Sequence, residues 1–221
     1  YGLSNGTGTN NIYRNNINNL STSSTATTAG LVSGIYISGV TNHYVYNNFI
    51  SDLKAPLAAS TDAIRGINCT ATTASSNLGL YYNTIYLNAT SSGANFGTSG
   101  IYHTNSTTST TAQLDMRDNI VVNNSTPVGT GLTVAFRRSA ANASLNNYST
   151  LSNNNDFYAG TPGPSNLIFN DGTNSDQTLA DFKTRVTPRE SASFSENPTF
   201  INSTTTPYDL RINTTTPTQI E

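Results

Sequence analysis

Three charged residues in one short segment, Asp115, Arg117 and Asp118, come nearest to a catalytic group in this chain. Carboxylates bind calcium, which takes about six to eight oxygen ligands. Calcium would need further carboxylates from neighbouring segments, but the equivalent positions there carry Leu, Tyr, Ser and Asn. The isolated set therefore favours a solvated ion pair on the surface.

A second pair of acids, Asp52 and Asp62, falls in or beside one polar segment and could bring two carboxylates together. Glycoside hydrolases need such a pair about 5–10 Å apart. Nothing else in the segment supports a catalytic pair, so acids that keep a loop soluble are the favoured interpretation.

The two histidines and the single cysteine do not have the spacing of zinc ligands, and no Ser-His-Asp arrangement can be derived from the spacing. His103 is predicted to be a buried neutral imidazole bonded to backbone, in an inward file with Ile37, Cys69 and Val134. Because Cys69 is the only cysteine, no disulfide can form within the chain, which leaves the redox compartment open.

Four tyrosines, Tyr36, Tyr46, Tyr82 and Tyr102, are the candidates for ligand binding, because strand alternation points them outward. Exposed aromatic rings are surfaces on which a sugar ring packs. The alternative is that these tyrosines are ordinary strand residues covered by the polar inserts.

The elements that must position these residues follow from an internal repeat. A glycine followed by an aliphatic residue returns every 31 to 34 residues, at Gly2-Leu3, Gly34-Ile35, Gly66-Ile67, Gly100-Ile101 and Gly131-Leu132. A second marker keeps the same phase, at Arg14–Ile17, Tyr46–Phe49, Tyr82–Ile85, Arg117–Ile120 and Asn154–Phe157. Two markers with one period of about 20–50 residues indicate a stacked repeat in a single elongated body.

Each repeat is predicted to be one coil of β-structure. The residues after each glycine alternate apolar and polar at period two, so the first and third members should form inward files. The second marker predicts another inward file, made of Ile17, Phe49, Ile85, Ile120 and Phe157. Asparagine suits the turn before it, and a ladder of hydrogen-bonded side chains is expected along Asn16, Asn48, Thr84, Asn119 and Asp156.

Composition limits the function classes. Only 10% of the 221 residues are charged and the net charge is −2, so no basic surface is available for nucleic acid. Ser, Thr and Asn make up roughly four residues in ten, yet regularly placed apolar residues argue against disorder. No apolar run is long enough to span a membrane. The chain opens within the repeat without a signal peptide, so we expect a piece of a longer protein whose leader and anchor lie elsewhere.

The C-terminal quarter departs from the repeat. Residues 1–160 are predicted to form the coils, and residues 161–221 the final coils and a capping segment of the same domain. Leu179, Phe182 and Val186 have helical spacing, with Thr178 as N-cap, so a short helix should cover a side or an end of the stack.

The segments Gly34-Ile35-Tyr36-Ile37 and 46–53 (Tyr-Asn-Asn-Phe-Ile-Ser-Asp-Leu) resemble the right-handed parallel β-helix repeats of pectate-lyase-like proteins. The closing stretches 196–202, 208–212 and 217–220 resemble the final coils of secreted bacterial members, and the long Ser/Thr inserts resemble large surface proteins of Bacteroidetes-type bacteria. The resemblance implies fold and secretion, and it carries over no catalytic residue.

The sequence therefore predicts an all-β, right-handed parallel β-helix of about five long coils with an irregular C-terminal cap. We expect a non-enzymatic extracellular module of a bacterial surface protein, a stalk or adhesin that contacts glycans or another protein. The alternative is a polysaccharide lyase or glycoside hydrolase that uses Asp115, Arg117 and Asp118. Calcium enters only under the lyase alternative, and no other cofactor is expected. Coils could also stack end to end between molecules.

Overall fold

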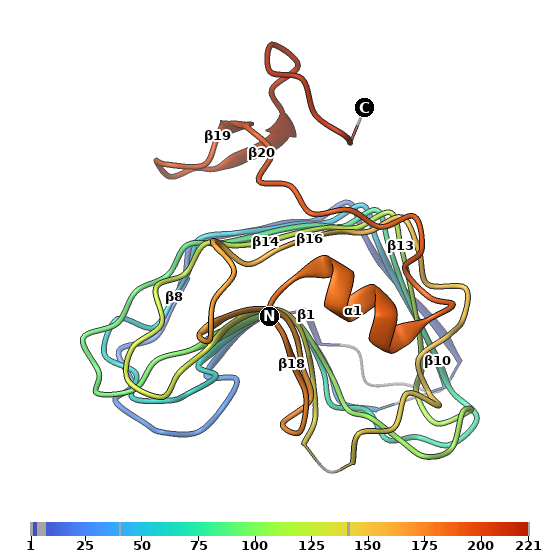
Figure 1. Ribbon diagram of the computed structural model, residues 1–221. Coiled ribbons are helices and arrows are strands. Elements are labelled where there is room, and N and C mark those ends of the chain that lie inside the picture. The colour runs from blue at the N-terminus through green and yellow to red at the C-terminus, as the bar shows by residue number, and fades with distance from the viewer. Residues whose placement is uncertain (1, 4–7, 40, 141, 221) are drawn as a thin grey trace.

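The computed structural model describes residues 2–3, 8–39, 41–140 and 142–220, and within them the chain winds into a parallel β-solenoid of about five turns (Figure 1). Sheet A contains β1 (Gly2–Leu3), β5 (Val32–Ile37), β9 (Ile64–Cys69), β12 (Thr98–His103), β15 (Thr133–Arg138), β17 (Asn166–Asn170) and β18 (Ser175–Asp176). Sheet B contains β2 (Thr9–Tyr13), β6 (Asn42–Tyr46), β10 (Asn77–Tyr81) and β13 (Gln113–Arg117). Sheet C contains β3 (Asn16–Ile17), β7 (Phe49–Ile50), β11 (Thr84–Leu87), β14 (Ile120–Asn123) and β16 (Asp156–Tyr158). The two-stranded pairs are β4 (Leu20–Ser21) with β8 (Leu53–Lys54), and β19 (Phe200–Asn202) with β20 (Asp209–Ile212).

The inward file of sheet A confirms the predicted stacking in the central coils. Ile35, Ile67 and Ile101 are partners in register and are fully buried. The next partner in this file is Phe136, so the prediction of Leu132 was wrong. Leu3 was also misplaced, because its backbone pairs with Tyr36 and not with Ile35; its side chain lies outside the described residues.

The error at Leu132 has a structural reason. Gly131 lies in a turn that passes against the backbone of Phe96. Glycine is needed there because a Cβ would collide with the neighbouring segment. In the strand that follows, Ala135 and Phe136 stand where earlier coils have glycine and isoleucine. The glycine marker therefore identified a turn in the fourth coil and not a strand.

Sheet C carries the next inward file, with one shift from the prediction. The partners in register are Ile17, Ile50, Ile85, Val121 and Phe157. The predicted members Phe49 and Ile120 point to the opposite face, because neighbouring residues of a strand alternate in direction. There they pack with a second apolar cluster that includes Val122 and Tyr208.

An asparagine ladder runs along the corner between sheets B and C, as predicted, but through partly different residues. Its members are Asn15, Asn48, Asn83, Asn119 and Asn155, and each Nδ2 donates to the Oδ1 of the next at 2.8–2.9 Å. The predicted Asn16, Thr84 and Asp156 each lie one position too late. The residue before each amide is left-handed, with φ between 54° and 59°, at Arg14, Asn47, Tyr82, Asp118 and Asn154.

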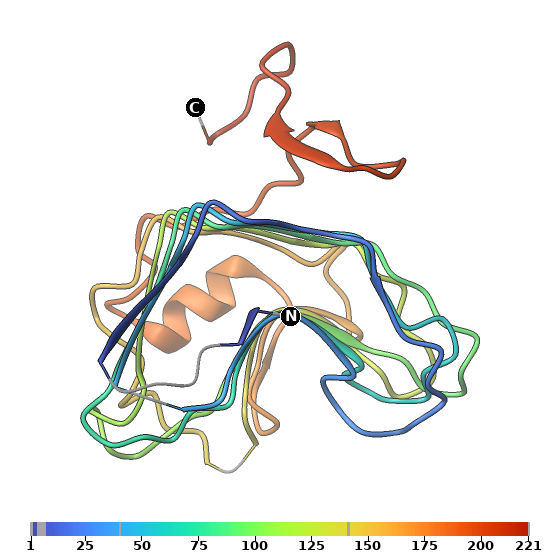
Figure 2. The ribbon, with the colours of Figure 1, turned by 180° about the vertical axis from the view of Figure 1, so that it is seen from behind.

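Helix α1 (Leu179–Val186) confirms the predicted cap. Thr178 Oγ1 accepts the Asp181 N–H at 3.2 Å, and Phe182 and Val186 are fully buried. Figure 1 shows α1 across one end of the coils, and Figure 2, seen from behind, shows it beyond the first coils. The helix thus closes the C-terminal end of the core, where Phe182 stacks on Phe169 with ring centroids 5.0 Å apart.

The last strands differ from the coils expected there. β19 and β20 pair antiparallel and lie outside the coil outline, beyond β14 and β16 (Figure 1). Phe200 and Tyr208 meet Tyr86 of sheet C at ring-centroid distances of 5.5 and 6.2 Å. This hairpin therefore covers apolar residues on the outer face of sheet C. No helix in the described part of the chain is long and apolar enough to cross a membrane.

Candidate functional site

The outer face of sheet A carries a buried ion cluster centred on Asp62. Arg65 Nε donates to Asp62 Oδ2 at 2.8 Å, and Ser99 Oγ donates to Asp62 Oδ1 at 2.6 Å. Arg137 Nε lies 3.5 Å from the same Oδ1 and donates to Ser99 Oγ at 2.8 Å. The side chains of Asp62, Arg65 and Arg137 are only 7, 9 and 13% exposed. Two arginines thus share one carboxylate, which leaves the cluster with one net positive charge.

The cluster continues along the same face toward the first coils. Arg65 Nη1 donates to Asn68 Oδ1 at 2.9 Å, and Asn68 Nδ2 donates to Ser33 Oγ at 3.0 Å. The Arg65 guanidinium also lies over the Tyr102 ring, 3.4 Å from its centroid. Sheet A bends inward here between two groups of loops (Figure 2). A hollow of about 300 Å³, which we call the groove on sheet A, is lined by Ser33, Tyr36, Arg65, Asn68 and Thr70, among others, and Tyr102 borders it through its contact with Arg65.

The structure brings Tyr36 and Tyr102 together but separates them from Tyr46 and Tyr82. Tyr36 and Tyr102 both pair in register with Asn68, so they belong to one file on sheet A, two coils apart. Tyr46 belongs to sheet B, where it stacks on Tyr13 with ring centroids 5.0 Å apart. Tyr82 stands on the corner between sheets B and C. The four candidates therefore lie on different faces and do not form one site.

The candidate lyase set is divided between two surfaces. Arg117 and Asp115 form a two-point ion pair at 3.0 and 2.6 Å on the outer face of sheet B, and Tyr81 donates to the same carboxylate at 3.0 Å. The hydrogen bond from Arg117 to Asp115 raises the arginine pKa, and burial, followed by the Asp115 charge, raises the pKa of Tyr81 to about 12. Asp118 is on the left-handed corner, and its side chain makes no hydrogen bond to any described residue.

The acids of the second pair have separate partners. Asp52 binds Lys54 at 2.7 Å and accepts from Thr206 of the C-terminal hairpin at 2.9 Å, on the side of sheet C. Asp62 belongs to the cluster on sheet A. The structure therefore gives each carboxylate its own hydrogen-bonded role on a different face.

His103 is a buried imidazole bonded to backbone, as predicted, with Nε2 2.9 Å from the Ala112 carbonyl oxygen. Burial, followed by the charge of Arg138, lowers its pKa to about 3. The predicted neighbour Val134 was wrong, because the partner of His103 in the next coil is Arg138. Cys69 precedes it in the file, and burial raises the pKa of its thiol.

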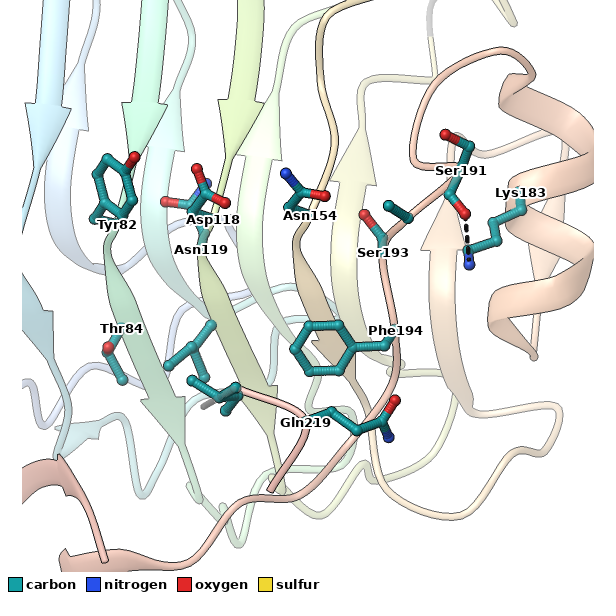
Figure 3. A pocket seen from close by; sticks show the side chains of 13 residues that line it. Tyr82, Thr84, Asp118, Asn119, Asn154, Lys183, Ser191, Ser193, Phe194 and Gln219 are labelled. Atoms are coloured by element: carbon teal, nitrogen blue, oxygen red, sulfur yellow. Dashed lines mark hydrogen bonds between the residues drawn. The ribbon is translucent and has the colours of Figure 1, made fainter. Parts of the chain in front are cut away.

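A larger cleft, of about 830 Å³, lies over the corner between sheets B and C (Figure 3). Tyr82, Asp118 and Asn154 project along one side, and Phe194 lies further down. Ile120 also lines the cleft. Lys183 of α1 lies at one end, where its Nζ donates to the Ser191 carbonyl at 3.1 Å. The C-terminal residues Gln219 and Ile220 form a further wall, and Gln219 N donates to Glu196 Oε2 at 2.8 Å.

Sequence reasoning missed both the Asp62 cluster and the corner cleft. Strand alternation could have placed Arg137 outward on sheet A, but it puts Arg65 on the same face as the inward Ile67. Asp62 comes from an insert whose path the repeat does not fix. The cleft depends on residues 183–220, which lie outside the repeat. No described group of three or more His, Cys, Asp or Glu side chains is arranged to hold a metal ion.

Taken together, these features describe a parallel β-solenoid with a polar groove on sheet A and a cleft on the opposite corner. Comparison of the chain with protein-family models, curated proteins and solved structures finds no significant match.

Proposed function

We propose that this chain is a non-enzymatic module of an extracellular bacterial surface protein, a β-helical stalk or adhesin of the pectate-lyase-like kind that contacts glycans through the groove on sheet A. The observation that carries the proposal is the double engagement of Asp62 by Arg65 and Arg137. A carboxylate whose two oxygens are already engaged by two guanidinium groups and a hydroxyl is not free to exchange a proton with a substrate. The same groups still offer hydrogen bonds to a ligand.

The Asp62 cluster beside the groove retains unused hydrogen-bonding capacity. Arg137 Nη2 is buried and has no partner among the described residues, and an unpaired buried donor is costly. To meet a sugar hydroxyl, which both donates and accepts, the Arg137 guanidinium would turn outward from the cluster on binding. Tyr36 and Tyr102 stand in the same file and would contact the apolar face of a sugar ring.

The body of the molecule supports a role as a spacer. Each coil is tied to the next by sheet hydrogen bonds and by the amide ladder, whose members Asn48, Asn83 and Asn119 are almost completely buried. Such an array resists bending because any bend would leave buried amides without partners. A rigid rod that displays a groove along its side fits a stalk or an adhesin.

Binding and turnover measured on the same polysaccharides test the proposal. Pectin, alginate and chondroitin fragments should bind without release of products, with or without calcium. Tyr102→Ala should weaken binding at least tenfold, while Tyr13→Ala, which removes an exposed ring on sheet B, should leave it unchanged. Turnover that disappears in Arg117→Ala would instead establish the lyase alternative. Absence of both binding and turnover would remove the glycan part of the proposal.

A further inference from the structure

The cleft over the corner between sheets B and C contains side chains that have no hydrogen-bond partner among the described residues. Tyr82, Asp118 and Asn154 make no side-chain hydrogen bond to any described residue. They occupy the same position in three successive coils, and coils stack about 4.8 Å apart. The cleft therefore presents a row of polar groups, one for each coil, beside the ring of Tyr82, which is 60% exposed.

The backbone fixes the direction of this row. All three residues are left-handed, with φ of 54°, 55° and 59°. Asparagine tolerates this conformation, whereas a tyrosine there is strained and gains no local hydrogen bond. The ladder amide that follows each residue is buried and holds the turn in place. The groups are thus positioned before a ligand arrives, which lowers the entropy cost of binding.

The chemistry of the cleft selects among ligand classes. Asp118 can only accept hydrogen bonds, Lys183 can only donate, and Asn154 does both, so a ligand must offer both donors and acceptors. The acid and the lysine balance in formal charge, which favours a neutral ligand. Beneath the cleft, the strands β10, β11 and β14 have a neighbour on both sides, and the edge strand β13 is bridged to Tyr148 and Asn153 of the next coil. An extended peptide therefore finds no free strand edge there.

From these features we infer that the corner cleft is a second binding site, which takes a neutral saccharide. The sugar ring packs on Tyr82 above the apolar floor of Ile120 and Phe194, and its hydroxyls bond Asp118 and Asn154. This site goes beyond the groove on sheet A and is independent of it, because the two lie on different faces of the solenoid.

A screen of soluble neutral oligosaccharides built from glucose, mannose, galactose or xylose, followed by titration calorimetry, tests the inference. Tyr82→Asn should weaken binding of the best oligosaccharide at least tenfold. Asparagine already occupies this left-handed position at Asn47 and Asn154, so the variant removes the ring and keeps the backbone. Asp118→Ala should weaken binding by a similar factor, and an unchanged melting temperature would show that both variants fold.

Two controls make the test specific. Tyr13→Ala removes a ring that is 48% exposed but lies outside the cleft, and it should bind as wild type. Tyr102→Ala alters the groove on sheet A and should also bind as wild type. The inference is overturned if no neutral oligosaccharide binds, if Tyr82→Asn and Asp118→Ala bind as well as wild type, or if Tyr102→Ala alone abolishes binding. The last result would assign the saccharide to the groove.

Discussion

Asn155 Nδ2 donates to both carboxylate oxygens of Glu190, at 2.9 and 3.2 Å, so the amide ladder ends on a buried acid. Glu190 also accepts the hydroxyl groups of Tyr148 and Ser193. A carboxylate that only accepts is a suitable terminus for a ladder whose amides all donate in one direction. The C-terminal segment thus satisfies the last ladder donor.

The interior of the ladder should contribute strongly to stability. Asn119 donates to Leu80 O and Asn155 Oδ1 and accepts from Asn83. Asn119→Ala leaves several buried groups unpaired and should lower the free energy of unfolding by about 2–4 kcal/mol. Asn146→Ala, at an exposed position whose side chain makes one hydrogen bond, should change it by less than about 1 kcal/mol. Chemical denaturation of both variants measures the difference, and equal effects would mean that the ladder is not a stabilising element.

Stability should fall as the pH rises from about 4 to about 8. Burial raises the pKa of Asp156 to about 8 from its usual 3.8, against the hydrogen bond from the Glu196 N–H, which lowers it; the Glu196 charge raises it further. A carboxyl group whose folded pKa is raised stabilises the fold fully below its unfolded pKa and loses this contribution as pH rises through the folded value. Burial also raises the pKa of Glu190, which acts in the same direction.

Asp156→Asn isolates this effect. Asp156 Oδ2 has no partner in the described structure, while Oδ1 accepts the Glu196 N–H at 2.8 Å, a bond that an amide oxygen can keep. Between about pH 4 and 8 the wild type should lose about 2–5 kcal/mol that the variant retains. Melting curves across this range measure it. If the stability of the wild type and of Asp156→Asn changed equally with pH, Asp156 would not be the cause of the loss.

The two residues predicted for one inward file should respond differently to truncation. Ile101 is fully buried between Ile67 and Phe136, so Ile101→Ala should cost about 2–5 kcal/mol, and Ile101→Asp should unfold the chain. Leu132 is only half-buried and lies outside the file, so Leu132→Ala should cost about 1–2 kcal/mol. A larger loss at Leu132 than at Ile101 would contradict the register of the fourth coil.

The glycine file of sheet A should not accept a side chain. A Cβ on Gly66 would lie 2.5 Å from both Gly100 O and Ile85 Cγ2. Gly66→Ala must push sheet A away from sheet C and should cost about 1–3 kcal/mol. Gly39→Ala serves as the matched control, because its Cβ would meet nothing nearer than Thr73 Oγ1 at 4.0 Å. Equal melting temperatures for the two variants would show that the sheets adjust without strain.

The period of the repeat was sufficient to predict the solenoid, because stacked coils require like residues at equal intervals. It could not settle register within a coil. Asn15 and Asn16 are adjacent and chemically identical, and only the left-handed turn at Arg14 decides which one enters the ladder. In the third coil the ladder residue could have been identified, because Asn83 is the only asparagine in the marker Tyr82–Ile85.

The candidate sites were less predictable for a physical reason. Periodicity reports on contacts between equivalent positions, whereas the Asp62 cluster joins an insert to strand residues of other coils. The corner cleft depends on Gln219 meeting the face that carries Asp118, about a hundred positions earlier in the chain. Neither contact joins equivalent positions of the repeat, so neither produces a periodic pattern in the sequence.

Because α1 lies across the end of the described coils, where the next winding would begin, we expect it to hinder a further molecule from adding its strands there. We therefore expect that fibre formation through this end of the solenoid would first require α1 to detach.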